Sequence, residues 1–264
     1  MIVWLNGTLH PLKEARIAPN DRGLLLGDGL FETLRAENGA PLRQDAHLAR
    51  LTRGAEVLGL PLPALDWDAA FRATLAANDL TRGSLRLTLT RGTGHRGLLP
   101  PAEPSPTVLI TAAPPAPPMG PVRLIIAQST RRNEYSPLSG LKSLNYGDGI
   151  LARREAQARG ADDAVILNTA GRLAETTIAT PFVLLGDRMV TPPLSEGGVA
   201  GIAREDILRA GLAEEAKLSL DDLKRTNGMV LTNSLGIRWV HELEGAALRE
   251  PIDFMSLFTE CLGA

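Results

Sequence analysis

The chain has 264 residues, enough for one large domain or two of ordinary size, and its formal net charge of −2 argues against a nucleic acid or an anionic membrane as partner. A single cysteine, Cys261, excludes a disulfide framework or a cysteine metal site within one chain. No stretch approaches the roughly eighteen apolar residues of a membrane helix, so we expect a soluble cytoplasmic protein.

The first half of the chain is predicted to mix strands with two helices. Asn6-Gly7 is a favourable hairpin turn between strands at 2–5 and 8–12. Asp45 is the expected N-cap of the first helix, which places Leu48, Leu51, Ala55 and Leu58 on one face. The remaining expected elements are a strand within 24–37, a helix at 67–77, and strands at 85–89 and 107–112.

A proline-rich segment at 114–118 follows, and it cannot join the interior of a sheet. It therefore predicts a boundary, with an N-terminal α/β domain at 1–113, a linker at 114–120 and a cofactor-binding domain at 121–264. The second half is predicted to contain strands at 121–128, 164–167, 173–185, 229–232 and 237–241, and helices at 147–159, 202–209 and 252–262. Because strands outnumber helices and many look hairpin-linked, the fold class indicated is α+β in two domains.

Lys142 is the first candidate for chemistry. Lysine occurs only at positions 13, 142, 217 and 224, and arginine supplies the remaining side chains with a permanent positive charge. Arginine stays protonated, whereas a partly buried lysine can lose its proton and act as nucleophile or base. The alternative interpretation is an ordinary solvated lysine in a loop.

Glycines 197, 198 and 201, just before the predicted helix at 202–209, suggest an anion site. Free N–H groups at a helix start favour a phosphate or carboxylate, although this spacing matches neither the P-loop nor the dinucleotide pattern. Arg50 could neutralise such an anion, or it could only cover apolar surface. For the glycines, a flexible connection is the alternative.

Two more charged residues are candidates. Glu175 lies in an otherwise apolar or hydroxylic strand, where a carboxylate needs a partner unless it faces solvent; it could hold a protonated ring nitrogen. Arg96, in a glycine-rich segment, suits a substrate carboxylate, with plain surface exposure as the alternative. The histidines at 10, 47, 95 and 241 show no metal-ligand spacing, so we expect no metal. A lysine, an anion loop, an arginine and a glutamate together fit pyridoxal 5'-phosphate.

Ordered motifs along the chain resemble the class IV (fold type IV) pyridoxal-phosphate enzymes. That family contains branched-chain aminotransferases, D-amino acid aminotransferases and aminodeoxychorismate lyases. The resemblance implies a smaller N-terminal α/β domain and a larger C-terminal barrel-like domain, with the cofactor between them and usually a homodimer. It rests on Gly27-Asp28-Gly29-Leu30-Phe31-Glu32-Thr33, His47-Leu48-Ala49-Arg50-Leu51, Lys142-Ser143-Leu144-Asn145-Tyr146, Glu175-Thr176-Thr177, Gly201-Ile202 and Thr232-Asn233-Ser234.

The resemblance also implies roles for single residues. Lys142 resembles the Schiff-base lysine, and Glu175 resembles the partner of the pyridine nitrogen. Tyr146 matches a residue that in some members hydrogen-bonds the phenolic oxygen of the cofactor. Arg96 resembles the arginine that takes the substrate carboxylate in D-amino acid aminotransferases.

The phosphate site implied by the resemblance is made by Arg50, the backbone at Gly201 and Ile202, and the turn at Asn233 and Ser234. Two departures weaken it. Residues 180–182 replace a more usual asparagine-containing segment, and residue 203 is an alanine where a hydroxyl often follows Gly-Ile. The loss of one phosphate hydrogen bond is therefore expected.

Within the family, residues 90–97 look most like the aminodeoxychorismate lyases, and Leu98 stands where D-amino acid aminotransferases tend to carry a histidine. We therefore expect a lyase that converts 4-amino-4-deoxychorismate to 4-aminobenzoate and pyruvate for folate biosynthesis. One alternative is an aminotransferase for branched-chain or D-amino acids with 2-oxoglutarate, because Lys142 and Glu175 serve both reactions. A more distant alternative is a non-catalytic protein that binds a phosphate ligand.

Overall fold

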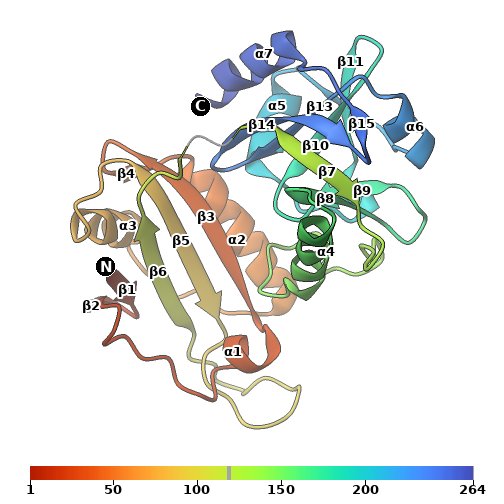
Figure 1. Cartoon of the computed structure of the whole chain (residues 1–264). Helices are drawn as coiled ribbons and strands as arrows, with labels where there is room; N and C mark the ends of the chain where they lie inside the picture. Colours follow the sequence, from red (N-terminus) through yellow and green to blue (C-terminus); the bar gives the residue numbers. More distant parts are fainter. Residues whose placement is uncertain (118–119, 264) are drawn as a thin grey trace. The chain divides into compact units, whose positions relative to one another are not determined.

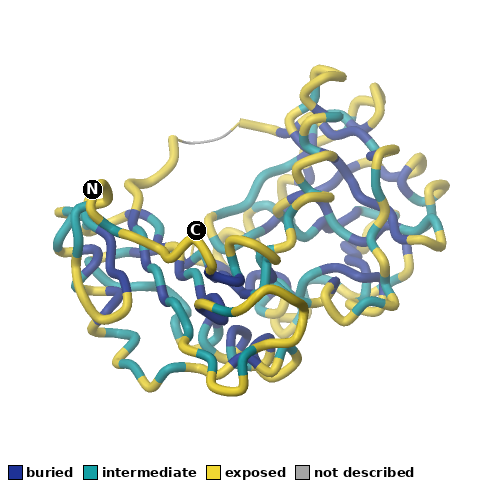
Figure 2. The backbone as a smooth tube through the Cα atoms, turned by 90° about the horizontal axis from the view of Figure 1, so that it is seen from below, coloured by how far each residue is buried: buried dark blue, intermediate teal, exposed yellow. Residues whose placement is uncertain are grey.

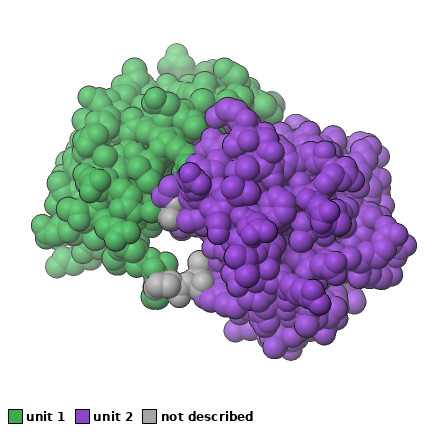
Figure 3. All heavy atoms as spheres, turned by 90° about the horizontal axis from the view of Figure 1, so that it is seen from above, with its two compact units in different colours: residues 1–117, 142–145 green, residues 118–141, 146–264 purple. Residues whose placement is uncertain are grey.

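A computed structural model describes residues 1–117 and 120–263, which form two compact units (Figures 1 and 3). Unit 1 comprises residues 1–117 and 142–145, and unit 2 comprises the other described residues. Residues 142–145 thus pack with the N-terminal part of the chain, although the sequence assigned them to the C-terminal domain. The division into 1–113, a linker at 114–120 and 121–264 stays a proposal, and residues 118 and 119 of that linker lie outside the described residues.

Unit 1 is built on an antiparallel sheet with the strand order β2-β1-β6-β5-β3-β4. Helices α2 (Gln44–Leu58) and α3 (Trp67–Ala76) pack against this sheet (Figure 1). Its strands are β1 (Ile2–Leu5), β2 (Thr8–Pro11), β3 (Gly29–Glu37), β4 (Ala40–Pro41), β5 (Gly83–Thr90) and β6 (Thr107–Ala113).

The core of unit 1 follows from alternation along β5, as the sequence predicts. Leu85, Leu87 and Leu89 are fully buried, and Leu30 of β3 is the direct cross-strand partner of Leu89. Each buried leucine contributes roughly 1.5–3 kcal/mol, and Figure 2 shows the buried stretches in dark blue. Helix α2 approaches closely because Gly54 faces Leu30, where a Cβ would lie 3.0 Å from Leu30 Cδ1.

Two expectations for unit 1 are wrong. The strand predicted within 24–37 begins only at Gly29, because residues 22–26 form helix α1 (Arg22–Leu26). The carboxylate of Asp21 accepts from the N–H of Gly23 and starts this helix, and Gly27 ends it in the left-handed conformation. Asp45 is not an N-cap, since α2 begins one residue earlier and Asp45 lies in its first turn.

Unit 2 contains a larger mixed sheet with the order β12-β11-β10-β13-β14-β7-β8-β9, and β15 pairs with β14. Its strands are β7 (Val122–Ile126), β8 (Asp163–Leu167), β9 (Leu173–Thr176), β10 (Thr180–Leu185), β11 (Arg188–Thr191), β12 (Glu214–Glu215), β13 (Gly228–Asn233), β14 (Gly236–Leu243) and β15 (Ala246–Ala247). Its helices are α4 (Gly147–Ala158), α5 (Ile202–Arg209), α6 (Leu220–Arg225), α7 (Ile252–Leu262) and the 3-10 helix η1 (Leu194–Glu196).

Helix α4 connects the parallel strands β7 and β8 and packs on them through small residues. Ala152 and Ala156 of the helix are fully buried against Ile125 and Ile166. Elsewhere, α5 and α7 pack on the sheet through a cluster in which the rings of Phe182 and Phe258 lie 5.0 Å apart. These two clusters support the strands and the helix start that carry the predicted site residues of unit 2.

The predicted helices 202–209 and 252–262 are confirmed with the same bounds. The predicted strand at 173–185 is divided into β9 and β10 by residues 177–179. Helix α6 was missed, although its capping box of Ser219 and Asp222 is a readable signal. None of the helices within residues 1–117 and 120–263 combines the length and apolar character needed to cross a bilayer.

Candidate active site

Lys142 lies on a short extended segment that pairs with the start of β3. The carbonyl oxygen of Lys142 accepts from the N–H of Phe31 at 2.9 Å, and the N–H of Leu144 donates to Gly29 at 3.0 Å. Ser143, between them, is buried and forms an antiparallel bridge with Leu30. The sequence predicts a loop here, and the pairing with β3 instead fixes the main chain on both sides of the lysine.

The ammonium group of Lys142 lies over an aromatic ring. Its Nζ is 4.4 Å from the centroid of the Phe31 ring, and the guanidinium carbon of Arg86 is 3.8 Å from the same centroid. Phe31 is buried, whereas Arg86 is exposed. A cation gains from the face of an aromatic ring, so Phe31 positions both basic groups.

Arg50 is buried and paired, not spread over apolar surface. Its Nε donates to Oε1 of Glu32 at 2.8 Å and its Nη2 donates to Oε2 at 2.5 Å. The ring of His47, one helical turn earlier, contacts the same Oε2 through Nδ1 at 2.6 Å. The exposed fractions of Glu32, His47 and Arg50 are 1%, 2% and 8%, so water screens this pairing little.

The ionisation of this cluster follows from its burial. Burial alone raises the pKa of Glu32, but the hydrogen bonds from Arg50 and His47 outweigh it and hold that pKa below its usual value. Burial lowers the pKa of His47, the charges on Arg50 and Lys142 act in the same direction, and Glu32 opposes them. A neutral His47, a charged Glu32 and a charged Arg50 therefore coexist at neutral pH, and the Nδ1–H of His47 donates to Glu32.

In unit 2, Glu175 of β9 is half-buried and held from two directions. Its Oε1 lies 3.0 Å from Nε of Arg132, and its Oε2 accepts from the N–H of Val199 at 3.0 Å. Arg132 also donates to the carbonyl of Gly197. The carboxylate therefore has a partner rather than facing solvent, and it is tied to the glycine loop before α5.

That glycine loop leads into the start of α5, where the first N–H groups lack intrahelical partners. A Cβ at Gly201 would lie 2.8 Å from Oγ1 of Thr180, so the hydroxyl of Thr180 stands against the helix start. Thr232 pairs directly with Thr180 across β13 and β10. Its Oγ1 is buried without a hydrogen-bond partner among the described residues. Unpartnered buried hydroxyls are costly, and one here is suited to an anion at this edge.

The remaining predicted residues of unit 2 lie on adjoining turns. Asn233 ends β13, and its Oδ1 accepts from the N–H of Leu235 at 2.9 Å, which fixes a turn that contains Ser234. Tyr146 is half-buried at the N-terminus of α4. Within unit 2 the structure thus joins Asn233 to the strand that carries Thr232.

Arg96 lies in unit 1, in the loop after β5, and is exposed. Its loop is anchored by Arg22, which donates to the carbonyls of Gly97, Leu98 and Leu99. Among the described residues no group of three or more histidine, cysteine, aspartate or glutamate side chains could hold a metal ion.

Four residues beside the predicted ones were missed from the sequence. Phe31 and Arg86 contact or adjoin Lys142, and Glu32 and His47 hold Arg50. The period of two along β3 was a usable signal, because it places Glu32 on the same face as the buried leucines on either side of it. No local signal indicates that Arg86 lies at the ring of Phe31.

A family model described as amino-transferase class IV matches residues 29–243. This chain belongs to the class IV aminotransferase family. Members of the family depend on pyridoxal phosphate, so the predicted class IV enzyme and its cofactor are confirmed at the level of the family. The alternative of a non-catalytic phosphate-binding protein is thereby set aside.

Relatives of this class IV chain carry two kinds of name. It is similar to a putative branched-chain-amino-acid aminotransferase of Methanocaldococcus jannaschii, with 32% identity over 94% of this chain and 90% of that protein. It is also similar to the aminodeoxychorismate lyase of Vibrio harveyi, with 31% identity over 88% of this chain and 87% of that protein.

Among solved structures, the 4-amino-4-deoxychorismate lyase of Pseudomonas aeruginosa is 33% identical, covers 98% of each chain and superposes with a TM-score of 0.85. The two-domain α+β fold of type IV is therefore confirmed.

Proposed function

We propose that this protein is an aminodeoxychorismate lyase that converts 4-amino-4-deoxychorismate to 4-aminobenzoate and pyruvate in folate biosynthesis. The observation that carries the choice is the segment 90–97, which has the residues of the lyases and presents an exposed Arg96 in the unit that holds Lys142. The 33% identity with the Pseudomonas aeruginosa lyase over nearly the whole chain supports it.

The residues present fit pyridoxal phosphate. Lys142 would bind the cofactor covalently, and Glu175, kept in place by Arg132, would hold the protonated ring nitrogen. Tyr146 would hydrogen-bond the phenolic oxygen. These assignments rest on the family resemblance together with the half-buried positions of the side chains.

The phosphate would be held by a cation and by neutral donors. Arg50 supplies the charge, and the backbone at Gly201 and Ile202 with the turn at Asn233 and Ser234 supplies donors. The unpartnered hydroxyl of Thr232 is the observation in this structure that fits an anion. The hydroxyl of Thr180 at the start of α5 would replace the one that Ala203 lacks.

The chain's own residues account for the rest of the reaction. Arg96 binds a carboxylate of the substrate, and Lys142 removes the proton from the ring carbon that bears nitrogen. When bound, the cofactor supplies a pyridinium ring that accepts the electron pair released at that carbon. The bond from the ring to the enolpyruvyl oxygen then breaks, the ring becomes aromatic, and enolpyruvate gains a proton at its methylene carbon to give pyruvate.

A transaminase for branched-chain or D-amino acids is the second candidate. The relative from Methanocaldococcus jannaschii, at 32% identity, favours the branched-chain form. Both reactions need Lys142 and Glu175, and they differ only in where the proton goes after it has left the substrate carbon.

The deciding experiment measures pyruvate released from 4-amino-4-deoxychorismate by the cofactor-loaded protein with no amino acceptor present. Repeated turnover with equal amounts of 4-aminobenzoate supports the lyase, because a transaminase stops without a second substrate. Absence of release, with amino exchange between branched-chain or D-amino acids and 2-oxoglutarate, would instead assign a transaminase. K142A serves as the inactive control for both assays.

We extend the proposal to a homodimer in the cytoplasm, which the family resemblance and the sequence lead us to expect. Sedimentation of the cofactor-loaded protein at several concentrations tests the dimer, and a concentration-independent monomer would refute it.

A further inference from the structure

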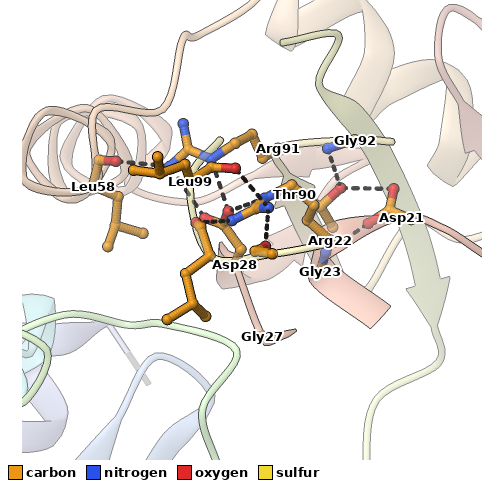
Figure 4. Close-up of polar contacts among 12 residues, drawn as sticks. Asp21, Arg22, Gly23, Gly27, Asp28, Leu58, Thr90, Arg91, Gly92 and Leu99 are labelled. Atoms are coloured by element: carbon orange, nitrogen blue, oxygen red, sulfur yellow. Dashed lines mark hydrogen bonds and ion pairs between the residues drawn. The ribbon is translucent and has the colours of Figure 1, made fainter. Parts of the chain in front are cut away.

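A buried network of two arginines and one aspartate lies where α1 meets β3. Nε of Arg22 and Nε of Arg91 both donate to Oδ2 of Asp28 at 2.8 Å, and Nη2 of Arg91 donates to Oδ1 at 3.1 Å (Figure 4). The two arginines are 4% and 5% exposed. Burial alone raises the pKa of Asp28, but the hydrogen bonds from Arg91 and Arg22 outweigh it and keep this carboxylate charged.

Arg91 fixes the network to the scaffold. Its Nη1 donates to the carbonyl of Gly59 and its Nη2 to that of Leu58, both at 2.7 Å (Figure 4). These carbonyls end helix α2, where a positive charge is favoured by the helix dipole. The surplus positive charge of two arginines against one aspartate is thus met by main-chain oxygens.

Arg22 directs its remaining N–H groups at a loop. Nη2 donates to the carbonyl of Leu98 at 2.7 Å, and Nη1 donates to those of Gly97 at 3.1 Å and Leu99 at 3.3 Å. Gly94 packs on the stem of the same side chain, since a Cβ there would lie 2.8 Å from Arg22 Cδ. One rigid guanidinium therefore holds three successive carbonyls directly after Arg96.

Burial of side chains does not hold this loop. Leu98 is 82% exposed and Leu99 is 89% exposed, so neither gains from leaving water. The hydrogen bonds from Arg22 are the contacts that offset the entropy of ordering residues 97–99.

The same turn adjoins the segment of Lys142. Gly27 and Gly29 flank Asp28, and a Cβ at Gly27 would lie 2.7 Å from Asn145 Oδ1. A Cβ at Gly29 would lie 2.9 Å from Cδ1 of Leu144, whose N–H donates to the carbonyl of Gly29. The turn that holds the two arginines therefore also contacts the strand segment that follows the lysine.

We propose that Arg22 is a positioning residue for substrate recognition: anchored through Asp28 to Arg91, it holds residues 97–99 so that Arg96 presents its guanidinium to a substrate carboxylate. This inference rests on the proposed function, because it takes Arg96 as the carboxylate-binding residue. It also explains why the loop can be exposed and yet specific. The residue that contacts the substrate and the residue that sets its position are different arginines.

The test uses the cofactor-loaded protein with R22K, R96Q and the double variant R22K/R96Q. R22K keeps a positive charge beside Asp28, but an ammonium group cannot reproduce the planar fork that spans three carbonyls. The matched control is R16Q, since Arg16 is an exposed arginine of unit 1 that donates to the main-chain carbonyls of Lys13 and Ala15.

We expect R22K to raise KM for the substrate about tenfold and to change kcat by less than about twofold, with cofactor affinity unchanged. R96Q should raise KM at least as much, and the double variant should be no worse than R96Q, because Arg22 acts through Arg96. Trypsin should also cut after Arg96 faster in R22K than in the wild type or R16Q, which reports on the loop without any turnover.

The possible failures are distinguishable. A normal KM in R22K alongside a raised KM in R96Q overturns the positioning role and leaves the proposed function intact. Independent, additive effects of R22K and R96Q overturn it as well. A normal KM in R96Q removes the carboxylate role of Arg96, and with it both the site assignment and this inference, even if trypsin shows a freed loop.

Discussion

Replacing Glu32 by glutamine should destabilise unit 1 strongly, because Glu32 is the buried counter-charge of Arg50. The carboxylate accepts from Nε and Nη2 of Arg50 and from Nδ1 of His47. A glutamine keeps one oxygen, and its amide NH2 turns a donor toward these donors. The charge of Arg50 is then left in a site that is only 8% exposed.

Two routes give a similar magnitude for E32Q. Breaking a buried ion pair by removing one partner costs about 3–5 kcal/mol. Losing two of the three hydrogen bonds, at about 1.5–3 kcal/mol for each bond to a charged group, gives about 3–6 kcal/mol. We therefore expect the free energy of local unfolding around β3 and α2 to fall by about 3–5 kcal/mol.

Hydrogen exchange is the suitable assay, because a chain of two units need not unfold in one step. The expected loss corresponds to exchange of β3 and α2 amides that is faster by about two to three and a half powers of ten. The matched control is E37Q, on the same strand. Glu37 also pairs with two arginines, Arg35 and Arg82, but Arg82 is 67% exposed. Exchange in E32Q that is no faster than in E37Q would refute the reasoning.

Four further outcomes follow. K142A should retain its far-ultraviolet circular dichroism but lose turnover and the borohydride-sensitive yellow colour; near-normal activity would refute the assignment. Because burial keeps the pKa of His47 below its usual 6.5, the unfolded chain takes up a proton first as pH falls through about 6.5, and stability is lost. H47Q should flatten that part of the curve of unfolding free energy against pH, whereas an unchanged slope would contradict the buried neutral ring. R132Q, which loosens Glu175, should lower kcat about tenfold at unchanged cofactor content; kinetics like those of the wild type would contradict its supporting role. T180V should weaken cofactor binding about fivefold to tenfold in a fluorescence titration, as expected for one lost hydrogen bond, and undiminished affinity would remove Thr180 from the phosphate site.

The sequence by itself determined those features whose physical cause is local. The bounds of α5 and α7 follow from their periodic apolar residues and the glycines beside them, and the alternation along β5 indicates its buried face. The order of short motifs was sufficient for the family. Each of these signals lies within a few residues of chain.

Only the tertiary structure decided which polar side chains are buried together. Helix α2 buries His47 and Arg50 because Glu32, on a strand that precedes the helix, faces them. A helical pattern read alone places Leu48 and Leu58 in that stripe, and both are only half-buried.

The same limit applies to the contacts around the two key basic residues of unit 1. Arg22 holds the carbonyl of Leu98, which is 76 residues away in the chain, and the segment of Lys142 pairs with β3 across more than a hundred residues. Hydrogen-bond partners at such separations are brought together only when the sheet assembles, because the gain of each contact depends on burial that the other elements provide. The sequence therefore determined which residues carry the chemistry, and the fold decided what holds them in place.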